Sequence, residues 1–115
     1  MSGEINWFEL PSEDTARARV FYGKLFGWQT GECDDLDDYH IIENGAPGAI
    51  VPKTDELTGP RVYFATDDIA SSVAAVRDLG GTADDVVFVT GVGQIAHCRD
   101  DQGSPFSFYQ PARPA

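Results

Sequence analysis

Glu9 is the strongest candidate for acid–base chemistry in this 115-residue sequence. It lies among aromatic residues in the segment INWFEL, where loss of solvent would favour the protonated carboxyl and suit it to act as a general base. A nearby cation such as Arg61 would instead stabilise the carboxylate, which could then hold a cationic ligand. Both roles stay open, and Glu9 is the candidate catalytic residue.

The histidines and cysteines could also bind a metal ion, but their spacing gives no strong motif. A site built from His40, His97 and a carboxylate is conceivable, while packed or surface histidines are the ordinary alternative. His97 and Cys98 are adjacent on an expected strand, so they point to opposite faces and cannot both bind one ion. Cys33 and Cys98 are 65 positions apart and predict buried thiols rather than a zinc site or a disulfide framework. The acidic run 34–38 lacks the glycine and glutamate of a calcium loop and is expected to be a solvated loop.

The charge of the chain restricts its partners. With 8 Lys and Arg against 19 Asp and Glu, the net charge is −11, which argues against nucleic acid and anionic membrane surfaces. No apolar run approaches the roughly 18 residues that span a bilayer, and the first ten residues do not resemble a secretory signal. We therefore expect a single cytoplasmic domain that meets neither nucleic acid nor membrane.

A helix is predicted after the first strand, over residues 14–27. Its apolar residues recur at helical spacing, with Asp14 placed to cap the start and Gly27 placed to end it. The inward-facing residues are expected to be Ala18, Phe21, Tyr22, Leu25 and Phe26.

The same pattern returns 54 positions later, where Asp68 stands in the place of Asp14. The strand RVYFA precedes a second helix, whose inward residues are expected to be Ile69, Val73, Val76 and Leu79. Short strand candidates follow each helix, at 28–32, 39–43 and 48–52 and again at 86–90, 94–99 and 105–110. The repeat predicts an α+β fold of two β-α-β-β-β modules whose curved sheets enclose a cleft. Module one covers about 4–53, the linker about 54–59 and module two about 60–111.

Strand alternation places one set of side chains on the sheet faces that the helices leave uncovered. Aromatic area with a few polar groups is typical of a small-molecule pocket. The alternative is that the aromatics only fill space between sheets while Glu9 and Arg61 neutralise each other. The candidate ligand-binding residues are Trp7, Glu9, Arg61, Tyr63, Ser107 and Tyr109.

The two β-α-β-β-β modules, the run FYGKLFGW and the run from DDI to LGG resemble the vicinal oxygen chelate superfamily, in its glyoxalase-like branch. That superfamily includes glyoxalase I, bleomycin-resistance proteins and extradiol dioxygenases. The resemblance covers essentially the whole chain. It implies a cleft in each curved sheet and, in members that use a metal, divalent-metal ligands on the strands.

The metal-ligand positions implied by this resemblance fall on Trp7, Arg61 and Ser107. An indole, a guanidinium and a hydroxyl cannot replace two histidines and a glutamate as donors, so we expect no metal and no other cofactor. The expected function is binding of a small aromatic or cationic molecule, in the manner of bleomycin-resistance-like proteins. The alternative is a lyase, isomerase or dioxygenase with a rearranged metal site, or a metal-free enzyme that uses Glu9. Members of this superfamily often complete their sheets with a second chain, so a homodimer is expected.

Overall fold

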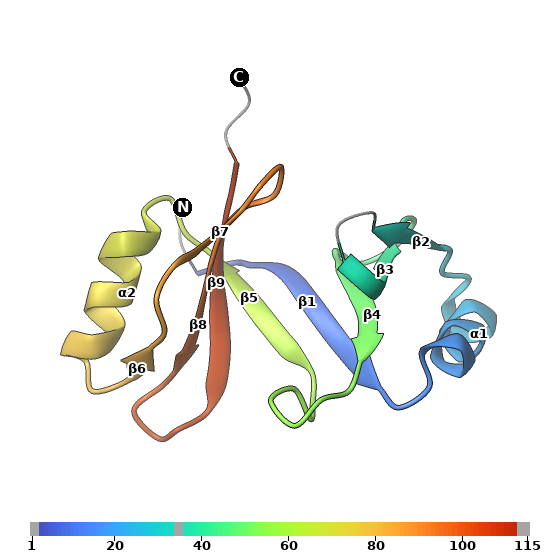
Figure 1. Cartoon of the computed structure of the whole chain (residues 1–115), viewed down its shortest axis with the longest axis horizontal. Coiled ribbons are helices and arrows are strands. Elements are labelled where there is room, and N and C mark those ends of the chain that lie inside the picture. The colour runs from blue at the N-terminus through green and yellow to red at the C-terminus, as the bar shows by residue number, and fades with distance from the viewer. Residues whose placement is uncertain (1–2, 34–35, 113–115) are drawn as a thin grey trace. The chain divides into compact units, whose positions relative to one another are not determined.

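The computed structural model describes residues 3–33 and 36–112, and its elements follow the β-α-β-β-β order twice, with one additional two-residue strand after the second helix (Figure 1). The first set is β1 (Ile5–Ser12), α1 (Thr15–Phe26), β2 (Thr30–Cys33), β3 (Leu36–Ile42) and β4 (Gly48–Pro52). The second set is β5 (Arg61–Ala65), α2 (Ile69–Asp78), β6 (Thr82–Ala83), β7 (Val87–Val89), β8 (Gly93–Arg99) and β9 (Pro105–Pro111). The α+β fold expected from the internal repeat is therefore confirmed. The strand expected at 86–90 is shorter, and the two-residue β6 precedes it.

The chain divides into two compact units. The first unit is Phe8–Arg61, and the second unit is formed by the residues up to Trp7 together with those from Val62 onward. Within the second unit, the amide of Gly3 donates to the carbonyl of Ala65 at 3.0 Å. This division into units does not test the module bounds expected from the sequence, and those bounds stay a prediction.

Both helices begin at the aspartates that the repeat singled out. Asp14 accepts a hydrogen bond from the backbone N–H of Arg17 at 3.1 Å, and Asp68 accepts one from Ser71 at 3.2 Å. Each carboxylate thus satisfies a backbone donor that the first helical turn leaves unpaired. Gly27 ends α1 with a φ of 77°, a left-handed conformation that glycine adopts without strain.

In the first unit, β1 runs parallel to β4, and β3 joins β4 to β2. Phe8 lies beside Gly48, and a Cβ on Gly48 would come within 2.6 Å of the Phe8 ring. Only glycine allows this close approach of the two strands. Ala49 and Ile50 on β4 are fully buried and form the centre of this unit.

The inward face expected for α1 is only partly covered. Ala18 and Tyr22 are half-buried, but Phe21, Leu25 and Phe26 are 58%, 57% and 58% exposed. Aromatic residues instead cluster at the C-terminal end of the helix, where Tyr22 stacks on Trp28 with ring centroids 5.4 Å apart. The helical spacing of apolar residues predicts α1, but the expected packing of Phe21, Leu25 and Phe26 against the chain's own sheet is wrong.

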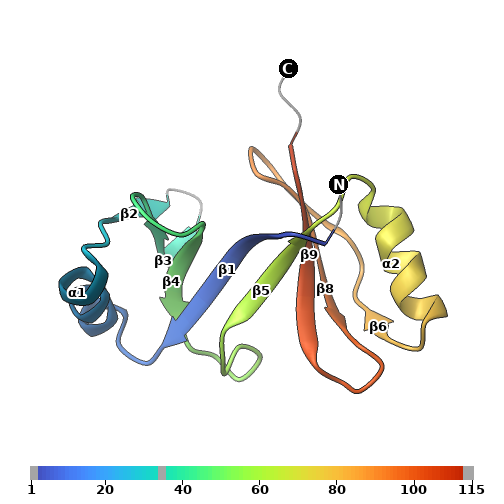
Figure 2. The same cartoon turned by 180° about the vertical axis from the view of Figure 1, so that it is seen from behind.

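In the second unit, β5 runs parallel to β9, and β8 pairs antiparallel with β9, β6 and β7. Figure 2 shows α2 beside β8 and β6, on which it packs. Ile69 and Val73 of α2 meet Ala96 and Cys98 of β8 in a buried cluster, with Phe106 and Phe108 of β9 packed against it. Leu79, expected to face inward, is exposed because the helix ends at Asp78 and Leu79 is its cap.

Strand alternation then fixes the opposite face of this sheet. Since Cys98 and Phe106 face α2, their neighbours His97 and Ser107 face away from it. Within the described residues, neither helix has the length and apolar character needed to cross a membrane.

Candidate functional site

The helix-free face of the second unit's sheet brings together three of the six predicted binding residues. Tyr63 of β5 lies directly beside Ser107 of β9, and Ala65 lies beside Tyr109 two positions further on. Because register partners share a face, Tyr63, Ser107 and Tyr109 point to the same side. The parity argument made from the sequence is consistent with this arrangement.

A histidine joins this face. The Nδ1 atom of His97 lies 2.7 Å from the Oγ atom of Ser107, and Ser107 has no exposed surface. The ring of His97 also meets the ring of Tyr63 edge-on, with centroids 6.2 Å apart. The hydroxyl of Ser107 is therefore held in a buried polar contact, and a buried polar group with a partner is far less costly than one without.

Tyr109 adds a second hydroxyl near the end of β9. It donates to the carbonyl oxygen of Val92 at 3.2 Å, and burial raises the pKa of the Tyr109 phenol. Asn6 donates from Nδ2 to the Tyr109 carbonyl at 3.1 Å. Tyr109 is thus a neutral hydrogen-bonding group at ordinary pH.

Glu9 and Arg61 form an ion pair in the first unit. The Oε1 atom of Glu9 lies 3.8 Å from the Nη1 atom of Arg61, and Glu9 is only 8% exposed. That distance allows charge attraction but exceeds hydrogen-bond length. The Glu9–Arg61 pairing, one of the alternatives that the sequence left open, is present, and it provides a largely desolvated carboxylate beside a guanidinium. Trp7, the sixth predicted residue, is half-buried on β1 and belongs to the second unit.

The metal-ligand positions implied by the family resemblance do not fit a divalent ion. The indole of Trp7 has no lone pair to give, and the guanidinium of Arg61 is a cation paired with Glu9. The hydroxyl of Ser107 is hydrogen-bonded to His97, and it does not replace the glutamate carboxylate of metal-using members as a metal ligand. These side chains cannot supply the two or three charged or imidazole donors of a catalytic metal site.

The two histidines are engaged in separate contacts. His40 lies in the first unit and bonds to Asp38, whereas His97 lies in the second unit and bonds to Ser107. Over residues 3–33 and 36–112, no three His, Cys, Asp or Glu side chains gather as a group that could hold a metal ion. Burial raises the pKa of the Cys98 thiol, which keeps it protonated and poorly reactive.

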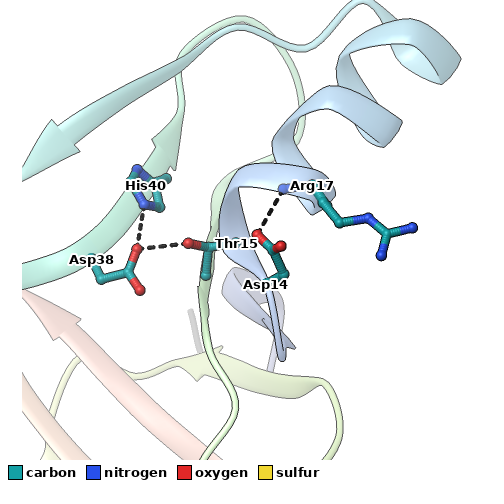
Figure 3. A network of polar contacts seen from close by, with 5 residues as sticks. All are labelled: Asp14, Thr15, Arg17, Asp38 and His40. Atoms are coloured by element: carbon teal, nitrogen blue, oxygen red, sulfur yellow. Dashed lines mark hydrogen bonds and ion pairs between the residues drawn. The ribbon is translucent and has the colours of Figure 1, made fainter.

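A polar network ties the start of α1 to β3 (Figure 3). The hydroxyl of Thr15 and the Nε2 atom of His40 both donate to Oδ1 of Asp38, each at 2.7 Å. These bonds, that from Thr15 first, lower the pKa of the Asp38 carboxyl. Asp38 itself has a φ of 54°, a conformation that aspartate and asparagine tolerate better than most residues.

The acidic run was expected to be a loop, but Asp37 and Asp38 belong to β3. Residues 34 and 35 lie outside the described residues. A hollow of about 780 Å³ is lined by Glu32 and Cys33 of β2 and by residues 36–40 of β3. Sequence reasoning did not identify this hollow, which lies beside a register shift between Glu32 and Cys33 in the β2–β3 pairing.

Comparison with known proteins identifies the family. A family model for the N-terminal part of bleomycin resistance protein-like sequences matches residues 4–45. A glyoxylase-like domain-containing protein of Didymella fabae is 31% identical over 91 residues, which cover 70% of this chain and 71% of that protein. The chain therefore belongs to the glyoxalase-like branch of the vicinal oxygen chelate superfamily, together with the bleomycin-resistance-like proteins.

Two further similarities are more distant. Anthracycline biosynthesis protein DnrV of Streptomyces peucetius is 28% identical over 132 residues, with 94% of this chain and 47% of that protein covered. The chain thus spans less than half of that relative's length. Homoprotocatechuate 2,3-dioxygenase of Brevibacterium fuscum, solved with 3,4-dihydroxyphenylacetate, matches 96% of this chain and 37% of its own, with a TM-score of 0.73 at 18% identity. An identity this low shows a shared fold alone.

Proposed function

We propose that this protein binds a small organic molecule on the helix-free faces of its sheets without a metal ion. In the second unit Trp7, Tyr63 and Tyr109 supply aromatic area and Ser107 supplies a polar contact, and in the first unit Glu9 and Arg61 supply the charged groups. The ligand is aromatic or cationic, and the protein acts in the cytoplasm. Membership of a family that includes bleomycin-resistance-like proteins supports a binding role over metal catalysis.

The observation that carries this proposal is the donor set at the implied metal positions. Ser107 stands where metal-using members have a glutamate, and its hydroxyl is buried against His97. Arg61 stands at another such position and brings a positive charge, which would repel a divalent cation. Aromatic rings beside a few fixed polar groups are suited to hold an organic ligand.

The test is a titration of the protein with neutral and cationic aromatic compounds, including an anthracycline because a relative is named for anthracycline biosynthesis. The chain has two tryptophans, so a Trp28→Phe variant reports the emission of Trp7 alone. A ligand that stacks on Trp7 should quench this emission. Calorimetry measures the same affinities in a Trp7→Ala variant, which lacks the fluorophore.

Glu9→Gln keeps the side-chain volume and removes the charge. For a cationic ligand we expect a loss of about 1.5–3 kcal/mol, roughly ten- to hundredfold in affinity, and much less for a neutral one. Glu13→Gln, which neutralises an exposed carboxylate just beyond the same strand, is the matched control and should leave affinity unchanged. If every compound binds wild type, Glu9→Gln and Trp7→Ala alike, the ligand does not contact these residues and the proposal fails.

One observation favours the alternative of a metal-free enzyme. Glu9 is only 8% exposed and lies 3.8 Å from Arg61, and a largely buried carboxylate is a group that can act as a general base. Incubation of the same compounds with wild type and Glu9→Gln, followed by mass spectrometry, would detect turnover. Product formed by wild type and lost in Glu9→Gln supports the enzyme, whereas unchanged compounds support the binder.

A further inference from the structure

The side-chain amide of Asn44 bridges two segments of the first unit. Its Oδ1 atom accepts a hydrogen bond from the backbone N–H of Gln29 at 2.6 Å, and its Nδ2 atom donates to the carbonyl oxygen of Gly27 at 3.0 Å. The backbone N–H of Glu43 donates to the carbonyl oxygen of Gln29 at 2.8 Å beside it. The amide bridge of Asn44 therefore holds the chain that leaves α1 against the loop between β3 and β4.

Asn44 is followed by Gly45, and both residues are exposed to solvent. The backbone nitrogen that follows an asparagine can attack its side-chain carbonyl carbon, because the two atoms close a five-membered ring within one chain. Glycine hinders this attack least, since it has no Cβ and a flexible backbone. Within the portion of the chain that the structure covers, the N–H of Gly45 makes no hydrogen bond. The two reacting groups of a cyclisation thus adjoin each other in a solvent-exposed loop.

The backbone N–H of Gln29 adds assistance to this reaction. When a nitrogen adds to Cγ of Asn44, negative charge develops on Oδ1, and a fixed backbone donor at hydrogen-bond distance stabilises that charge. The two contacts also identify Oδ1, because the backbone N–H of Gln29 is a donor and the carbonyl of Gly27 is an acceptor. The fold therefore polarises the carbonyl that Gly45 would attack.

We propose that Asn44 and Gly45 form a self-modifying site, at which the folded protein converts Asn44 to aspartate or isoaspartate with the N–H of Gln29 as oxyanion donor. The nitrogen of Gly45 forms a bond to Cγ of Asn44, the bond from Cγ to Nδ2 breaks, and the proton of the Gly45 amide leaves with Nδ2 as ammonia. Water then opens the cyclic imide at either of its carbonyl groups. One water is consumed and one ammonia is released, with no oxidation or reduction.

The modification removes the amide bridge. A carboxylate at position 44 has no N–H to donate to Gly27, and it brings negative charge to the C-terminal end of α1, which is already the negative end of the helix dipole. Isoaspartate also lengthens the backbone of a loop that is tightly packed, since a Cβ on Gly45 would come within 2.5 Å of Nε1 of Trp28. The end of α1 should therefore loosen slowly and irreversibly as the protein ages.

Mass spectrometry of the full chain after incubation in warm, mildly alkaline buffer gives the first test. Asn6, the only other asparagine, is the internal control, because Trp7 follows it and its Nδ2 atom donates to the carbonyl of Tyr109. Conversion at Asn44 should be at least about tenfold faster than at Asn6. An isoaspartyl methyltransferase assay should detect isoaspartate at position 44. An Asn44 that is converted no faster than Asn6 would overturn the proposal.

The same incubation in guanidinium chloride separates the effect of the fold from that of the Asn–Gly sequence. The unfolded chain keeps Asn44 and Gly45 adjacent but loses the fixed donor from Gln29. Conversion should be at least about threefold faster in the folded protein, because the oxyanion donor is present only there. A folded protein that is converted at the same rate or more slowly would refute the role of this donor.

Asn44→Asp tests the consequence for α1. Its melting temperature should fall by about 4 °C or more, because one hydrogen bond is lost and a carboxylate is placed beside the helix end. Gln102→Glu makes the same amide-to-carboxylate change in an exposed turn of the second unit and should leave the melting temperature nearly unchanged. An Asn44→Asp variant that melts like wild type would contradict the proposed loosening.

Discussion

The hydrogen bond between Ser107 and His97 should contribute measurably to stability, and Ser107→Ala removes it with almost no change in volume. Ser107 is fully buried, and its Oγ atom is 2.7 Å from Nδ1 of His97. Loss of such a bond costs about 1 kcal/mol, and removing this partner from the half-buried His97 raises the loss to about 2 kcal/mol. We expect the free energy of unfolding to fall by about this amount.

Ser12→Ala provides the contrast. The hydroxyl of Ser12 is also buried, but no hydrogen-bond partner for it occurs in the described part of the chain. Replacing a buried unpaired hydroxyl by hydrogen removes a desolvation penalty, so this variant should be as stable as wild type or more stable by up to about 1 kcal/mol. The two variants make the same chemical change with opposite expected signs.

Urea unfolding measures both effects. With a slope of about 1.5 kcal/mol per molar urea, Ser107→Ala should lower the midpoint by about 1.3 M, and Ser12→Ala should leave it unchanged or raise it. Equal midpoints for Ser107→Ala and wild type would refute the argument that this buried contact stabilises the sheet. So would a Ser12→Ala variant that loses as much stability as Ser107→Ala.

Three further outcomes are expected. Asp38→Asn should be less stable than wild type at neutral pH, and because the folded-state pKa of Asp38 is lowered, the difference should shrink as pH falls below about 4, as acid unfolding curves would show. Gly93→Ala should lower the free energy of unfolding by about 2 kcal/mol or more in thermal melts, since Gly93 has a φ of 140° and a Cβ there would collide with the carbonyl of Gln110. Gly59→Ala is the control, because a Cβ on Gly59 meets nothing within 4 Å. Addition of a chelator should leave the melting temperature unchanged, because a bound metal would stabilise by mass action; about one metal ion per chain retained after dialysis would contradict this.

Local sequence signals predicted the elements well because the forces that set them are local. Asp14 and Asp68 cap helices through hydrogen bonds that span three residues, and their 54-residue offset is visible without any tertiary information. Strand alternation likewise placed Cys98 on the opposite face from His97, since neighbouring side chains on a strand must alternate. The same argument could have added His97 to the candidate ligand-binding face.

Contacts between distant segments could not be predicted, because they depend on strand register and on the packing of whole elements. Ser107 meets His97 only because β8 and β9 pair in one particular register. The exposure of Phe21 and Leu25 depends on where α1 lies on its sheet, which helical spacing alone does not determine. The roles of the six candidate residues in ligand binding stay predictions.

The parallel pairing of β1 with β4 and of β5 with β9 affects how the chain can fold. Phe8 pairs with a residue 40 positions later, and Tyr63 pairs with one 44 positions later, so each module closes with its last strand. Such distant pairings slow folding, because the entropy of closing a long loop is lost before the strand contacts form. During synthesis the second module cannot complete its sheet until β9 has left the ribosome. Until β9 is available, Phe64 of β5 lacks its β9 neighbour Phe108. The chain is most prone to aggregation during this interval.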